Sequence, residues 1–149
     1  MHLRQYGLFS EEEYKIVQAK FQIAVWMNLI ESTDLEALEV RRQRKNHRIQ
    51  EELQKGTVVY GLTYYSPAIY LQYELTRLKL DFVTYKGTQI GPYICPEITL
   101  EQKQKFYQEQ PLLFARANGD SFSFEEVEQI IEKRLKEKEY ENLVQSLLC

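Results

Sequence analysis

Hydrophobic residues are densest in one stretch of the chain, from Phe21 to Ile30, where only Gln22 and Asn28 are polar. A helix on a protein surface shows one apolar stripe, whereas a helix that is apolar nearly all round is buried on several sides. About ten residues are too few to cross a bilayer, which needs roughly 20. The pattern therefore predicts that this stretch, which holds the only Trp, is the second half of a central helix and carries much of the core's apolar area.

Most helix starts are marked by a capping box, in which a Ser or Thr is followed three residues later by Glu or Gln. The boxes begin at Ser10, Thr33, Thr99 and Ser123. A further start is indicated by Ser66 before Pro67, because Pro suits the first position of a helix. We expect helices over about 11–31, 34–55, 67–85, 99–110 and 124–148.

The stretches between these helices have no helical periodicity. Residues 57–61 are rich in β-branched side chains, but a single strand has nothing to pair with, so we expect an extended linker. Residues 87–97 hold two Gly and two Pro, which predicts a loop. Residues 111–120 are predicted to connect two helices. The fold class that follows is all-α. We expect one domain over residues 1–149, with about five helices and with long N-terminal and C-terminal helices packed around the central apolar one.

Composition adds few constraints. The chain has 149 residues and a net charge of -3, so no general attraction to nucleic acid or to anionic membranes is expected. Cys95 and Cys149 belong to no CxxC pair, and we expect two free thiols. No leader and no membrane-spanning stretch is visible, which predicts an extracytoplasmic protein if a leader was removed and a cytoplasmic one if Met1 is the native start.

The sequence offers little for catalysis. His2 and His47 have no ligand partners at metal-binding spacing, and no nucleophile or phosphate-loop motif occurs. The carboxylate clusters already serve as negative charges at helix starts. We therefore expect a protein that is not an enzyme and that has no catalytic, cofactor or metal site.

A basic run extends from Arg41 to Arg48. It could contact phosphates, which would favour nucleic-acid binding. Because glutamates flank it and its arginines fall on several sides of a helix, the favoured interpretation is a solvated face with salt bridges.

Tyrosines cluster between residues 60 and 73. Tyr70 and Tyr73 share a helix face that we expect to differ from the face of Leu71 and Leu75. Two interpretations remain open: the tyrosines line a groove for apolar peptide segments, or they pack inside the core. The candidate peptide-binding residues are Tyr64, Tyr65, Tyr70 and Tyr73.

Several short segments carry a family resemblance: residues 35–42, 56–61, 65–70, 99–102 and 124–127, together with Phe106, Tyr107, Pro111 and Phe114. Over roughly residues 9–148 the chain resembles the chaperone core of secreted foldases of the SurA and PrsA type, especially divergent Gram-positive relatives. The resemblance implies helices that cradle unfolded polypeptide. Those relatives insert a parvulin isomerase domain before the last helix, whereas residues 112–122 are too few for one, so no isomerase site is carried over.

Three functional hypotheses follow. The first is a non-catalytic module that binds peptides or unfolded proteins through an aromatic groove. The second is an accessory partner-binding subunit of a peptide-maturation or secretion system. The third is a homodimer formed by exchange of the last helix across residues 111–122.

Overall fold

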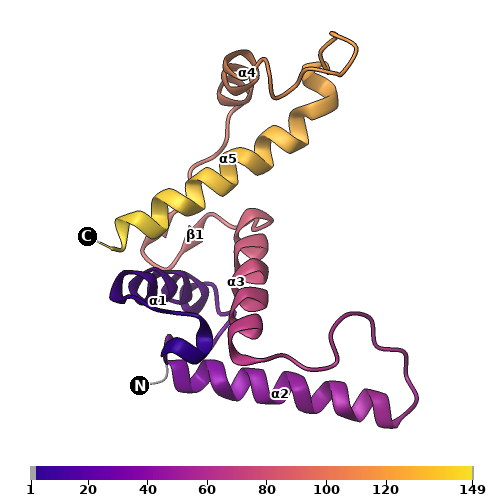
Figure 1. Ribbon diagram of the computed structural model, residues 1–149. Coiled ribbons are helices and arrows are strands. Elements are labelled where there is room, and N and C mark those ends of the chain that lie inside the picture. The colour runs from indigo at the N-terminus through magenta and orange to yellow at the C-terminus, as the bar shows by residue number, and fades with distance from the viewer. Residues whose placement is uncertain (1–2, 149) are drawn as a thin grey trace. The chain divides into compact units, whose positions relative to one another are not determined.

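The computed structural model describes residues 3–148, and helices dominate them (Figure 1). The helices are η1 (Leu3–Tyr6), α1 (Glu11–Trp26), α2 (Leu35–Gln54), α3 (Pro67–Val83), α4 (Leu100–Glu109) and α5 (Phe124–Ser146). Two short strands, β1 (Gln89–Ile90) and β2 (Tyr93–Ile94), form an antiparallel hairpin. The all-α class and the five α-helices predicted from the sequence are confirmed.

The chain divides into two compact units. The first comprises the residues up to Leu78 together with those from Val144 onward, and the second runs from Lys79 to Leu143. That both fold together as a single domain stays a prediction.

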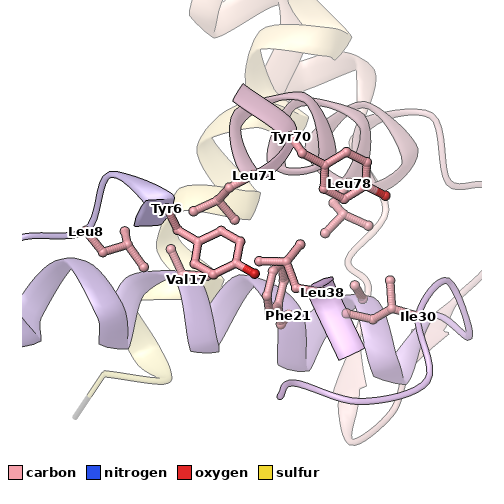
Figure 2. Packing of buried hydrophobic residues seen from close by; sticks show 10 residues of the cluster. Tyr6, Leu8, Val17, Phe21, Ile30, Leu38, Tyr70, Leu71 and Leu78 are labelled. Atoms are coloured by element: carbon pink, nitrogen blue, oxygen red, sulfur yellow. The ribbon is translucent and has the colours of Figure 1, made fainter. Parts of the chain in front are cut away.

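The first unit has a core built from α1, α2 and α3. Figure 2 shows the side chains of Phe21, Leu38 and Leu71 converging there, and each is 0% exposed. Burying such a side chain stabilises a fold by roughly 1.5–3 kcal/mol. Ile23, on another side of α1, is only 1% exposed, so this helix is buried on more than one face as the apolar pattern predicts. Residues 21–30 supply four of the buried core side chains, Phe21, Ile23, Ala24 and Ile30, whereas Trp26 itself is only partly buried.

The second unit has a smaller aromatic core. Phe114, Val127 and Ile131 are buried together. Phe106 and Tyr107 of α4 pack against them, with ring centroids 6.2 Å and 5.2 Å from that of Phe114. The four-residue apolar spacing along α5 thus brings α4 and the connector onto one face of the last helix.

α1 ends earlier than the hydrophobic pattern predicts. Asn28 adopts a left-handed conformation, with φ of 60°. Its amide donates to the Val25 carbonyl (3.0 Å), and the Leu29 amide donates to the Ala24 carbonyl (2.9 Å). These two bonds form a Schellman motif, which ends a helix where Gly or Asn takes the left-handed conformation. The second polar residue of the apolar stretch is therefore the one that stops the helix.

The predicted helix caps are confirmed in part. The boxes at Thr99 and Ser123 form: the side chains of Gln102 and Glu126 accept from the backbone amides of Thr99 and Ser123, respectively. At Ser10 the hydroxyl accepts from the Glu13 amide (3.1 Å), but Glu13 reaches back to the amide of the preceding residue. The box expected at Thr33 is wrong, because α2 begins one residue later, after Asp34, without a side-chain bond at the cap.

The loop expected over residues 87–97 contains the hairpin that the sequence analysis missed. Its two-residue turn holds Gly91, whose φ of 55° suits glycine. Ile90 is 1% exposed and Ile94 is 65% exposed, so the hairpin is packed down at Ile90 and open to solvent at Ile94. Two residues per strand are too few for a periodic pattern to be seen in the sequence.

The left-handed residue yields a first prediction. We expect Asn28→Gly to be at least as stable as the parent chain and Asn28→Ala to be about 1 kcal/mol less stable than Asn28→Gly, because a Cβ is strained in this conformation. Urea denaturation measures both. Gln50 lies exposed inside α2, and there the order should reverse, with Ala more stable than Gly. The same order at both positions would contradict the argument.

Candidate binding site

Three of the four candidate tyrosines meet in the first unit. The ring centroids of Tyr65, Tyr70 and Tyr73 lie 5.1–6.0 Å apart. Tyr70 is 7% exposed and shares its cluster with Leu71, so the expectation that the tyrosines and leucines occupy separate faces is wrong. Tyr64 lies apart from the three, 60% exposed. Their contact with a polypeptide stays a prediction.

A buried ion pair lies beside these rings. Arg41 of α2 donates to both carboxylate oxygens of Glu74 on α3, at 2.5–3.1 Å, and to Glu31 at 3.0 Å. The side chains of Arg41 and Glu74 are 10% and 9% exposed. The Arg41 guanidinium also lies 5.5 Å from the centroid of the Phe21 ring. The prediction of a solvated basic face is therefore wrong for Arg41, and no local signal reveals its partner 33 residues away.

A cavity of about 360 Å³ opens between α2 and α3. Its lining residues are Leu29, Ile30, Arg41, Arg44, Lys45, Arg48, Tyr70, Tyr73, Glu74, Arg77 and Leu78. Lys45 lies 4.9 Å from the centroid of the Tyr73 ring and donates to its hydroxyl at 3.3 Å, and Arg77 donates to the same oxygen at 3.2 Å. Burial acts to raise the pKa of Tyr73, but the hydrogen bonds from Arg77 and Lys45 outweigh it and lower that pKa. The cavity thus combines an aromatic floor with a strongly cationic wall.

The segment that joins α2 to α3 is clamped at its end. The Asn46 side chain accepts from the Tyr65 amide (2.8 Å) and donates to the Tyr65 carbonyl (3.0 Å). Arg42 donates to the same carbonyl (3.0 Å) and to the Tyr64 hydroxyl (3.2 Å). Arg42 is in turn held by Glu39, which also accepts from the Tyr6 hydroxyl at 2.5 Å and from the Gln43 side chain at 3.4 Å. The clamp connects α2 to the residue at which the chain turns into α3.

Before this clamp the chain runs as a wide loop (Figure 1). The structure confirms the extended linker, with no strand over residues 57–64. Its exposed apolar side chains occupy alternate positions: Val58 (69%), Tyr60 (91%), Leu62 (47%) and Tyr64 (60%). We call residues 57–64 the exposed segment. None of these four side chains is charged, and the chain bends between Tyr60 and Leu62 at Gly61, whose φ is 91°.

The remaining chemistry is sparse. A second cavity of about 720 Å³, within the second unit, includes Cys95, which is a free thiol whose pKa is raised by burial. Cys149 and His2 lie outside the described residues, and His47 is exposed beside Glu51. Within residues 3–148, no three His, Cys, Asp or Glu side chains gather to hold a metal ion, and no helix is long and apolar enough to span a membrane.

Comparison with solved structures finds GH136 lacto-N-biosidase from Eubacterium ramulus. The native crystal structure superposes with a TM-score of 0.82 over 91% of this chain, at 28% sequence identity. The selenomethionine derivative gives a TM-score of 0.81 over 90% of this chain, also at 28% identity. In both cases the match spans only 27% of the lacto-N-biosidase chain. No family model and no curated protein matches the sequence.

This similarity overturns the resemblance to SurA and PrsA foldases. With it fall the chaperone function and the accessory role in peptide maturation or secretion. The physical reason lies in the motifs that carried the resemblance. Capping boxes and short amphipathic runs mark the ends and faces of helices in any helical domain, so they indicate where helices begin without distinguishing one helical family from another.

The clamp around Arg42 makes stability depend on pH. Hydrogen bonds from Arg42, helped by Tyr6 and opposed by burial, lower the pKa of Glu39 from 4.5 to about 2. A lowered folded-state pKa stabilises the fold fully above about 4.5, and this contribution is lost as pH falls towards about 2. We therefore expect the melting temperature to fall over this window, and to fall less in Glu39→Gln. Equal pH dependence of both proteins in calorimetry would contradict the assignment.

A third prediction concerns Asn46. Asn46→Ala removes both bonds to the Tyr65 backbone, and we expect it to lower the free energy of unfolding by about 1–3 kcal/mol. We also expect a protease to cut faster within residues 57–64, as mass spectrometry of the fragments would show. Gln50→Ala, at an exposed position on the same helix, is the matched control. Equal cleavage rates in the two variants would show that the clamp does not hold the segment.

Proposed function

We propose that this chain is the helical module of a carbohydrate-cleaving protein and that it docks onto the part that carries the catalytic residues. The observation that supports the proposal is the unequal coverage: 91% of this chain superposes on only 27% of a lacto-N-biosidase. A lacto-N-biosidase of that kind has nearly three quarters of its length beyond the matched helices. The remainder to which this module docks would belong to the same polypeptide or to a separate one.

The exposed segment supplies a surface for such docking. Val58, Tyr60 and Leu62 present apolar and aromatic side chains to solvent. Exposed apolar surfaces of this kind usually mark contact sites. Tyrosine is enriched at the centres of interfaces, and charged residues are depleted there. Residues 57–64 carry no charge. The clamp at Tyr65 restricts the segment at one end and thereby lowers the entropy lost on docking.

The test begins in the genome that encodes this chain. A polypeptide encoded there that matches the rest of the lacto-N-biosidase is co-expressed with this chain. The dissociation constant of the complex between the two is measured, together with the cleavage of a chromogenic lacto-N-bioside. We expect a one-to-one complex. In Val58→Ala/Tyr60→Ala/Leu62→Ala, affinity should fall at least tenfold, which corresponds to about 1.4 kcal/mol.

The matched control truncates three other exposed apolar side chains of the same unit, Val40, Leu53 and Ile69, to Ala. Its affinity should stay within about twofold of the parent chain, while both variants keep the helical circular-dichroism spectrum. Absence of any complex would overturn the proposed function. A complex that both triple variants weaken equally would keep the docking role but remove the exposed segment from the interface.

A further inference from the structure

We propose that the cavity between α2 and α3 binds the oxyanion group of a small phosphorylated or sulfated ligand. This inference concerns the first unit alone and stands independently of the docking role. It rests on the placement of charge around the cavity, on the hydroxyl at its floor and on the size of the opening.

The cationic residues of α2 converge on the cavity because of their spacing. Arg41, Arg44, Lys45 and Arg48 follow one another at intervals of three, one and three residues, so they lie along one face of the helix. Like charges three or four positions apart on a helix repel each other and destabilise it by a few tenths of a kcal/mol. α3 adds Arg77 to the same cavity. An anion between the two helices would relieve this repulsion.

The carboxylates near the cavity do not supply that anion. Glu74 is the single acidic residue in the lining, and Arg41 already takes both of its oxygens as well as one oxygen of Glu31. Within the described residues, neither Arg44 nor Arg48 has an ion pair with a carboxylate, although Arg44 acts on Glu31 from a distance. Their guanidinium groups therefore remain to bind a ligand, and the planar fork of a guanidinium matches two oxygens of a phosphate or sulfate.

Tyr73 adds a polar group to the floor of the cavity. Its hydroxyl oxygen accepts from Lys45 and Arg77, so its proton is left to donate. A hydroxyl between two cations is a strong donor to an anion, because the same cations stabilise the negative charge that develops on it. The hydroxyl thus orients the ammonium of Lys45 and offers one more hydrogen bond.

The volume of the cavity fits a compact ligand. At about 360 Å³ it lies at the lower end of the roughly 300–1,000 Å³ that is typical of small-molecule sites. Leu29, Ile30 and Leu78 add apolar side chains to the lining. This combination suits a small body that carries one oxyanion group.

The test titrates the full chain with inorganic phosphate, inorganic sulfate, glucose 6-phosphate and glucose at constant ionic strength. Nuclear magnetic resonance follows the amides and the guanidinium groups. We expect saturable shifts at residues 44–48 and 73–78 with the three anions and none with glucose. Tighter binding of glucose 6-phosphate than of phosphate would assign the site to a phosphorylated sugar, and equal binding would assign it to the free oxyanion.

Variants separate this site from general surface charge. Arg44→Gln/Arg48→Gln should weaken phosphate binding at least tenfold, and Tyr73→Phe by about three- to tenfold through the lost hydrogen bond to a charged acceptor. Lys15→Gln/Lys55→Gln removes the same charge from exposed positions of this unit and should leave the affinity within about twofold. Arg41 is left unchanged because its ion pair is structural.

Two results would overturn the proposal. One is the absence of saturable shifts with phosphate, sulfate and glucose 6-phosphate alike. The other is equal loss of affinity in the cavity variant and in the Lys15/Lys55 variant. Neither result bears on whether the chain forms a complex with a catalytic remainder, so the two proposals can fail separately.

Discussion

A charge inside a small core must be paired, and the pairing of Arg41 with Glu74 constrains how α2 faces α3. Both side chains are nearly buried, and an unpaired charge at such a depth costs several kcal/mol. The two helices can therefore pack only in an arrangement that keeps these groups together. The guanidinium also lies against the ring of Phe21, which connects the pair to α1. The clamp at Tyr65 and the cavity lined by Tyr73 both follow from this arrangement.

The basic side chains of α2 fall into two groups, one that stabilises the fold and one that lines the cavity. Arg41 and Arg42 belong to the fold, since one pairs with Glu74 and the other holds the Tyr65 backbone. Arg44 and Arg48 have no such role and line the cavity. The exposed segment connects α2 to α3, and its apolar side chains face solvent. The docking role that we propose assigns that surface to the contact with a catalytic partner.

Sequence reasoning identified the candidate tyrosines but not their setting. Tyr70 and Tyr73 fall three residues apart on α3, which places them on one face, and the structure brings them together with Tyr65. The two interpretations, a groove or the core, could not be separated from the sequence, because amphipathic tyrosines suit both burial and binding surfaces. In the structure Tyr70 is buried in the core, whereas Tyr73 lines the cavity. The prediction of a solvated basic face missed the cationic wall of the cavity, because the residues that complete the cavity lie on α3, well after α2 in the chain. The foldase resemblance was wrong because it relied on helix-end motifs that many unrelated helical domains share.

Local chemistry alone determined where most helices begin, that the fold is all-α, and that residues 57–61 are extended. Capping bonds and helical periodicity act within a few residues, so the sequence displays them directly. Asn28 was visible as a polar break, although its left-handed conformation emerged only in the structure. Tertiary structure decided that Arg41 meets Glu74, that Asn46 holds Tyr65, and that four basic side chains of α2 share a cavity with Tyr73. These contacts join residues 19 to 33 positions apart, and they depend on how whole helices pack rather than on any pattern along the chain.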